Sequence, residues 1–148
     1  MKPFRFSLAR ILELREAAER DQAAALGRAT AAEAEQEQRT RASHARLEAM
    51  QEQAALPSQS LAVGILRAYS MALEAARVQA DGDARDSDTA RQQSRAEAER
   101  FTDARQDRQV IERLRDKRRA AWTADAERTE QGAMDELAQR KHAAKDPT

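Results

Sequence analysis

The sequence predicts an all-α fold, a long antiparallel two-helix coiled-coil hairpin with unequal arms, in which the second helix overhangs the first. Pro57 is the only proline between Pro3 and Pro147, so about fifty residues before it and about ninety after it can be helical without a break. Ala, Arg, Glu and Gln dominate, and each costs little to place in a helix. The apolar residues comprise 34 alanines and only 26 larger side chains, enough for a narrow seam between helices and too few for a compact core.

Composition limits the function classes. The 148 residues contain 26 Lys+Arg, 26 Asp+Glu and no cysteine, so the chain is hydrophilic, electrically balanced and without thiol chemistry. Leu, Ile, Val and Phe together number 20, which raises intrinsic disorder as an alternative. The zero net charge and the abundance of helix formers favour a helical rod with frayed ends instead.

No part of the sequence predicts a membrane span or a secretion signal. No run approaches the ~20 consecutive apolar residues that a transmembrane helix needs. The N-terminus is followed by charged residues and has no apolar core or small-residue cleavage site typical of a signal peptide. We therefore expect a cytoplasmic protein.

The first predicted helix covers about residues 3–55, within a single hairpin domain of residues 1–148. Leu12, Leu26 and Leu47 are separated by 14 and 21 residues, both multiples of the seven-residue repeat of a coiled coil. The same stripe contains Glu19, Glu33 and Thr40. The stripe beside it contains Arg15, Gln22, Ala29, Gln36, Ser43 and Met50. Such a thin and polar seam associates weakly and fixes its register loosely.

The predicted turn lies at about residues 56–60, and the second helix at about residues 61–143. This helix opens with the densest apolar patch of the chain, formed by Leu61, Val63, Ile65, Leu66, Tyr69 and Leu73. From Gln79 to Arg100 nothing apolar is larger than alanine. We therefore expect a bend or local fraying in that stretch.

A hairpin folded at Pro57 makes a prediction about register. Residues at about equal distances from Pro57 lie near each other, which places Leu12 beside Phe101, Phe4 beside Val110, and Met50 beside Leu66. The second helix then outruns the first by roughly 30 residues, on the order of 45 Å. This overhang contains Trp122, Met134 and Leu137, and we expect them to have no partner within the chain.

The residues do not predict an enzyme. His44 and His142 are 98 positions apart, no spacing of carboxylates and histidines resembles a metal site, and the four glycines are scattered. A rod also lacks a concave pocket in which to lower a reaction barrier. We expect no catalytic residue, no cofactor and no metal.

Three features can still carry function, and each has a structural alternative. The run from Arg105 to Arg119 holds seven basic residues, which suit a solvated helix face first, an acidic protein surface second and nucleic acid third. Trp122, the only tryptophan, suits an interface anchor better than a core. The patch around Tyr69 and Leu73 can close the hairpin or present a face to a partner.

Two short motifs make the sequence resemble a known family. The opening Phe4-Arg5-Phe6-Ser7-Leu8 with Ile11-Leu12-Glu13-Leu14-Arg15, the break near residue 57, and Met134-Asp135-Glu136-Leu137-Ala138-Gln139-Arg140 resemble the FliJ family of the bacterial flagellar export apparatus. The resemblance covers nearly the whole chain. The C-terminal motif and the unequal hairpin carry its specificity, because any coiled coil shares the heptad pattern.

The resemblance implies a non-enzymatic, stalk-like component of the flagellar type III secretion system. The implied partners are the export ATPase FliI and its regulator FliH, the export gate protein FlhA and export chaperones, with peripheral association at the cytoplasmic face of the inner membrane and no nucleic acid. The implied ATPase-ring residues are Phe4, Leu8, Ile11, Leu12, Val110, Ile111, Leu114, Arg115, Arg118, Trp122, Met134 and Leu137. The implied gate residues are Arg46, Leu47, Met50, Tyr69, Leu73 and Ala76.

Three alternatives stay open at this point. The equivalent stalk of a virulence injectisome has the same architecture. A holding chaperone built from a helical hairpin is less well supported, since periplasmic examples need a signal peptide. A nucleic-acid-binding coiled coil predicts a steep salt dependence of binding.

Overall fold

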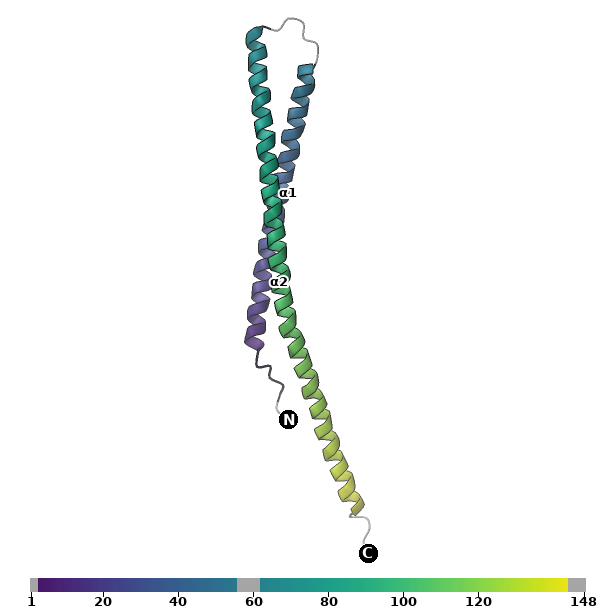
Figure 1. Ribbon diagram of the computed structural model, residues 1–148. Coiled ribbons are helices and arrows are strands. Elements are labelled where there is room, and N and C mark those ends of the chain that lie inside the picture. The colour runs from purple at the N-terminus through teal and green to yellow at the C-terminus, as the bar shows by residue number, and fades with distance from the viewer. Residues whose placement is uncertain (1–2, 56–61, 144–148) are drawn as a thin grey trace. The chain divides into compact units, whose positions relative to one another are not determined.

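The computed structural model describes residues 3–55 and 62–143, and all regular structure within them is helical (Figure 1). Helix α1 spans Ala9–Ala55 (47 residues) and helix α2 spans Val63–Ala143 (81 residues). The two long helices pack against each other, which confirms the predicted all-α hairpin class. The predicted turn at about residues 56–60 lies outside the described residues.

Helix α1 begins at Ala9, later than the sequence suggested. Its first amides bond to the preceding segment, Ala9 N to Phe6 O at 3.2 Å and Leu12 N to Leu8 O at 3.0 Å. In a helix, Phe4 and Phe6 would point to nearly opposite faces, because successive residues are about 100° apart. The irregular backbone of residues 3–6 instead lets both rings reach α2.

The described residues group into two compact units. One, the terminal unit, consists of residues 3–19 and 104–143; the other, the central unit, consists of residues 20–103. In the central unit, Thr40 Oγ1 donates to Asp83 O at 2.9 Å and Arg91 donates to Glu37 at 3.0 Å. Numbers that rise along α1 meet numbers that fall along α2, so the two helices are antiparallel within this unit. The same order holds within the terminal unit, as the contacts below show.

The seam predicted on α1 is confirmed. Leu12 is buried at 7% exposure, and every other predicted seam position except Arg15 is at least half-buried. The polar members are used across the seam: Gln36 Nε2 donates to the Asp83 carbonyl at 3.3 Å, the same oxygen that Thr40 bonds. A heptad stripe with few leucines therefore still defines the buried face of α1.

The seam of α2 is made largely of small residues that a search for large apolar side chains passes over. Ala80, Ser87 and Ser94 are buried at 1%, 5% and 7% exposure and are spaced by seven. Small side chains at a helix interface let the two backbones approach closely. The fraying expected between Gln79 and Arg100 is wrong, because α2 is one continuous helix there.

The predicted register is also wrong. Phe4 faces Trp122 and not Val110, Arg15 bonds Asp107, and Tyr69 donates its hydroxyl hydrogen bond to the backbone oxygen of Met50. The midpoints of these pairs lie between about residues 60 and 63, three to six positions after Pro57. One reason is that α1 ends at Ala55 and α2 begins only at Val63, so the break extends mainly to the C-terminal side of the proline.

Candidate functional site

All twelve residues that the sequence assigned to ATPase-ring binding lie in the terminal unit. They separate into three groups by exposure. Phe4, Leu8, Leu12, Ile111, Leu114 and Arg115 are buried or half-buried, and Ile11, Val110, Arg118 and Trp122 are exposed beside them. Met134 and Leu137 are exposed further along α2.

The N-terminal segment docks on α2 through aromatic and polar contacts. The rings of Phe4 and Trp122 lie with their centroids 6.0 Å apart and their planes at 54°. The Arg118 guanidinium lies 5.9 Å from the centre of the Phe6 ring, and its Nη1 donates to Ser7 Oγ at 2.7 Å. Aromatic pairs and cation–π contacts of this kind each contribute on the order of 0.5–1 kcal/mol. The site residues predicted from the sequence did not include Phe6 and Ser7, although both belong to the Phe4–Leu8 motif.

Trp122 therefore has a partner within the chain, contrary to the sequence prediction. The error follows from the register, which the sequence placed about ten residues too early along α2. Trp122 is 37% exposed, so one side of the indole contacts Phe4 and another side stays open to a partner.

The Phe4→Ala substitution should change the fluorescence of Trp122. Removing the Phe4 ring exposes the indole to water, so we expect a red-shifted emission maximum and stronger quenching by acrylamide. The signal is unambiguous because Trp122 is the only tryptophan. Met134→Ala is the control and should leave the spectrum unchanged, while an unchanged spectrum in Phe4→Ala would contradict the contact.

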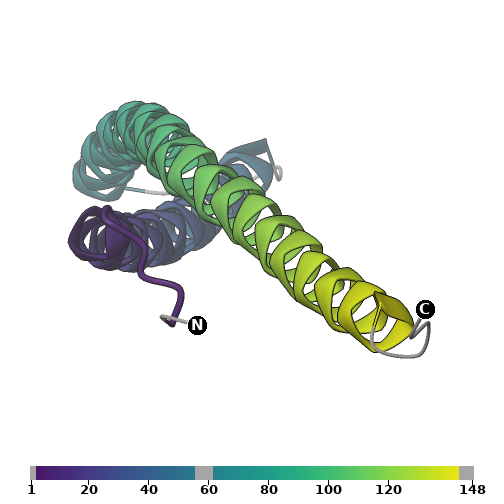
Figure 2. The same cartoon turned by 90° about the horizontal axis from the view of Figure 1, so that it is seen from below.

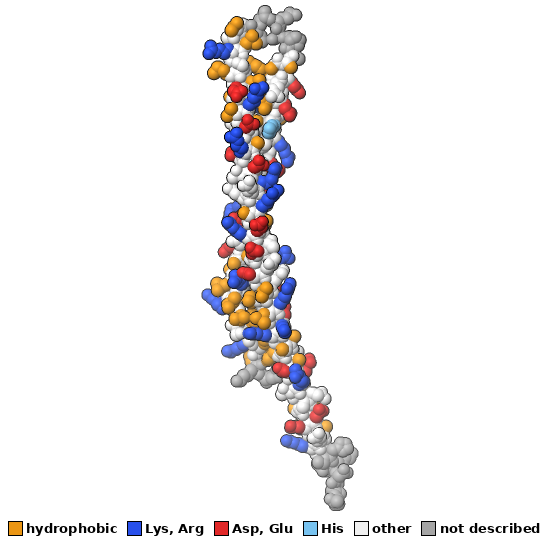
Figure 3. Space-filling view, in the orientation of Figure 1, with side chains coloured by type: hydrophobic (Ala, Val, Ile, Leu, Met, Phe, Trp, Pro, Cys, Tyr) orange, Lys and Arg blue, Asp and Glu red, His pale blue; other side chains and the backbone are white. Residues whose placement is uncertain are grey.

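A lateral apolar patch flanks the seam of the terminal unit. Ile11 and Leu114 each precede a seam residue, and in an antiparallel pair these positions lie on the same edge of the seam. Leu14 and Val110 lie one helical turn from them and further from the seam, toward the outer faces of the two helices. Ile11, Leu14 and Val110 are 41%, 58% and 60% exposed. Figure 3 shows hydrophobic side chains gathered beside the first turns of α1.

The basic run of α2 divides into paired and free cations. Arg108 donates to Glu19 across the seam and to Glu112 along α2, and Arg115 bonds Asp116 at 2.9 Å. The hydrogen bond to Glu19, followed by the attraction of nearby carboxylates, raises the pKa of Arg108 above the ordinary arginine value. The Arg108 guanidinium is therefore charged throughout the neutral pH range, and the contribution of its raised pKa is lost as the pH rises through that pKa.

The remaining cations of the run have no such partner. Arg113, Lys117 and Arg119 are exposed and form no ion pair with any residue in the described ranges 3–55 and 62–143. Two of them, Arg113 and Lys117, lie one helical turn apart on the face of α2 that points away from α1. The terminal unit thus offers free positive charge next to its apolar patch.

Beyond Trp122, α2 continues with no second helix beside it among the described residues of the terminal unit. Residues 123–143 form about six more turns, on the order of 30 Å, instead of the roughly 30 residues predicted. Met134 is 67% exposed and Leu137 is 55% exposed. Figures 1 and 2 both show the yellow end of α2 extending past the N-terminal segment with no other described part of the terminal unit alongside. We call residues 123–143 the overhang.

The residues assigned to gate binding lie in the central unit and mostly within its seam. Leu47, Met50, Tyr69, Leu73 and Ala76 are half-buried between α1 and α2, and the Tyr69 hydroxyl bonds the Met50 carbonyl. Arg46 is exposed and borders a shallow groove with Arg39, Ala42 and Ala72. The patch therefore packs the two helices together and leaves Arg46 and the groove as its accessible edge.

Within the described ranges, no group of three or more His, Asp or Glu side chains could hold a metal ion. No helix among those residues is both long and apolar enough to cross a membrane.

A comparison with protein families decides the affiliation. The model of the family described as "Flagellar FliJ protein" matches residues 4–146, nearly the whole chain. The chain belongs to the FliJ family. Searches of curated proteins and of solved structures found no match. Membership of the FliJ family makes the chain a component of the flagellar export apparatus and confirms the resemblance seen in its motifs.

Proposed function

We propose that this FliJ-family protein acts without catalysis, by inserting its terminal unit into the hexameric ring of the export ATPase FliI. The observation that carries the proposal is the overhang, an exposed helix that continues directly from a packed pair of helix ends. A single helix is about 10–12 Å across, which suits a narrow central channel. Met134 and Leu137 supply apolar contacts there, and Ile11, Val110 and Trp122 supply contacts at the entrance.

The free cations support the same mode of binding. Arg113, Lys117 and Arg119 are not neutralised by neighbouring carboxylates among the described residues, so they remain available to acidic groups of a ring. Exposed ion pairs contribute little energy individually. Contacts of this strength can stabilise the assembled hexamer and still exchange as ring subunits turn over nucleotide.

The remaining roles rest on the family resemblance. We propose that the central unit meets the export gate protein FlhA at the accessible edge around Arg46, with Leu47, Met50, Tyr69, Leu73 and Ala76 supporting that edge. FliH and export chaperones are the further proposed partners. The proposed location is the cytoplasm, at the inner face of the inner membrane.

The proposal is tested with purified FliI. Adding the full chain should raise the ATPase rate and shift FliI toward hexamers at lower FliI concentration, as measured by phosphate release and by size-exclusion chromatography with light scattering. An ATPase rate and an oligomer size that do not respond to the chain would exclude the ring-binding role and leave the gate role to be examined.

A further inference from the structure

The outer face of α2 in the central unit carries a second apolar stripe. Its members follow alternating spacings of four and three, as in a coiled-coil seam. They are Gly64, Ala68, Met71, Ala75, Val78 and Gly82. We call this set the outer stripe. At 100° per residue, all six lie within about 40° of one line along the helix and roughly 140° away from the seam that meets α1.

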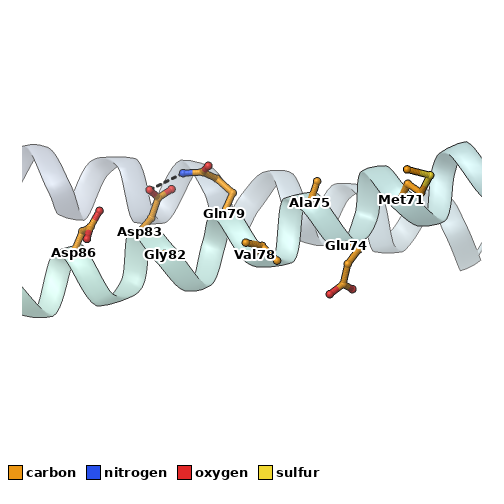
Figure 4. A pocket seen from close by; sticks show the side chains of 8 residues that line it. All are labelled: Met71, Glu74, Ala75, Val78, Gln79, Gly82, Asp83 and Asp86. Atoms are coloured by element: carbon orange, nitrogen blue, oxygen red, sulfur yellow. Dashed lines mark hydrogen bonds between the residues drawn. The ribbon is translucent and has the colours of Figure 1, made fainter.

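Among the described residues of the central unit, no element covers Met71 or Val78 of the outer stripe, which are 67% and 64% exposed although both are large and apolar. Gly82, at the end of the stripe, is half-buried. Figure 4 shows Met71, Ala75, Val78 and Gly82 in order along a shallow hollow, with Glu74 and Asp86 near it. An apolar helix face with seam spacing predicts a further helix as its partner.

The two glycines at the ends of the stripe leave room for close contact with another molecule. Glycine inside a helix is less stable than alanine, so it needs a reason. A Cβ atom at Gly64 or Gly82 would meet nothing within 4 Å, and neither residue has a backbone conformation that only glycine adopts. This chain's own packing therefore does not require glycine at either position, whereas the close approach of a second helix would.

We propose that the outer stripe pairs with the outer stripe of a second copy of this chain, in antiparallel orientation. A two-fold axis passes between Met71 and Ala75. It relates the two copies so that each of three layers of facing residues occurs twice. Gly64 faces Gly82 of the second copy, Ala68 faces Val78 of the second copy, and Met71 faces Ala75 of the second copy. Every large residue then lies against a small one. A parallel pair would instead place Met71 on Met71 and Val78 on Val78, so that large residues meet each other and the layers are uneven.

Charge complementarity supports the same register. Along one flank of the stripe lie Arg67 and Asp81, both exposed, and neither forms an ion pair within the described part of the chain. In the antiparallel register, Arg67 lies beside Asp81 of the second copy, and the symmetry produces this pair twice. The same register brings Glu74 beside Glu74 of the second copy at the axis, and each of these carboxylates is offset by its own pair with Arg77 at 3.6 Å. Side-chain size and charge thus favour a second copy as the occupant.

The contact spans about five helical turns, roughly 27 Å, so it is smaller than the interfaces of permanent dimers. We expect a reversible, concentration-dependent dimer. The outer stripe lies wholly in the central unit, so this inference does not depend on ring binding by the terminal unit.

Sedimentation velocity of the full chain over a concentration series tests the association. The wild type should shift from monomer to dimer, and Val78→Lys should remain monomeric at every concentration, because a charge would be buried in the contact. Val110→Lys is the control, since Val110 is similarly exposed but lies in the terminal unit. A wild type that is monomeric throughout, or a Val78→Lys variant that dimerises like wild type, would overturn the proposal.

Charge exchange tests the register. Asp81→Arg should weaken dimerisation several-fold, and the double variant Arg67→Glu with Asp81→Arg should restore it. A double variant that dimerises no better than Asp81→Arg would count against the Arg67–Asp81 pair.

Cysteine cross-linking tests the orientation, and it is clean because the chain has no cysteine of its own. A mixture of Met71→Cys and Ala75→Cys chains should oxidise mainly to mixed dimers, since a disulfide needs Cα atoms within about 7 Å. Gly64→Cys alone should not cross-link. Efficient Gly64→Cys homodimers would show a parallel pair and overturn the antiparallel one.

Discussion

Deleting residues 127–148 should abolish stimulation of FliI while leaving the packed part of the terminal unit intact. The truncated chain keeps Trp122, its contact with Phe4 and every seam residue of the terminal unit, so its Trp122 emission should match that of the full chain. It loses Met134 and Leu137, the two large apolar side chains of the overhang. We expect the ATPase rate to fall to that of FliI alone.

A point variant tests whether FliI binding depends on the apolar surface of the overhang and not only on its length. Leu137→Glu keeps the helix and places a charge on its exposed apolar face, so it should weaken FliI binding at least tenfold in a titration followed by ATPase rate. Thr129→Glu, an exposed position on the same helix outside the proposed site, is the matched control. Full stimulation by the truncated chain would show that the overhang is not the part that enters the ring.

Leu12→Ala should destabilise the terminal unit strongly, and Leu14→Ala should not. Leu12 is 7% exposed and Leu14 is 58% exposed, two positions apart on the same helix. Removing a buried leucine side chain costs about 2–5 kcal/mol, whereas an exposed substitution usually changes stability by less than about 0.5 kcal/mol. Helix propensity changes equally in both variants, so it cancels in the comparison.

Hydrogen exchange is the appropriate measurement, because a long thin seam need not unfold as one cooperative unit. In Leu12→Ala, the amides of residues 9–19 and 104–122 should lose protection by at least tenfold. The amides of the central unit should change little. Equal protection in the two variants would contradict the assignment of Leu12 to the core of the terminal unit.

The buried face of α1 could be predicted from the sequence because heptad spacing survives even where the residues are polar. Glu33, Gln36 and Thr40 occupy seam positions, and their neighbours by seven identify them. The seam of α2 could not be found in the same way, since Ala80, Ser87 and Ser94 carry no hydrophobic contrast with the rest of the helix. The only feature of the sequence that distinguishes the buried face of α2 is the seven-residue spacing of these small residues.

The register depended on contacts that no periodicity encodes. The Glu19–Arg108 and Phe4–Trp122 pairs join residues about 90 to 120 positions apart, and a shift by one heptad changes neither helix pattern. The assumption that Pro57 is the centre of symmetry displaced Trp122 from its partner. It also lengthened the predicted overhang.

The residues predicted for ring binding all lie in the terminal unit, where the N-terminal motif packs on α2 and the motif from Met134 to Arg140 lies in the overhang; their role in ring binding stays a prediction. The division between packing and exposed residues was not predictable without the register. Leu12 and Ile111 support the unit from within, whereas Ile11, Val110 and the overhang are available to a partner. Residues that bind another protein leave little signal in a single chain, because their complement lies outside it.

Photo-cross-linking tests ring binding by the terminal unit most directly. A photoreactive amino acid is placed at Leu137 in the overhang or, as the control, at the exposed Thr89 of the central unit, and each variant is irradiated with FliI under ATP turnover. We predict a covalent adduct with FliI from position 137 and none from position 89. An adduct from position 89 alone, or none from position 137, would contradict insertion of the terminal unit into the ATPase ring.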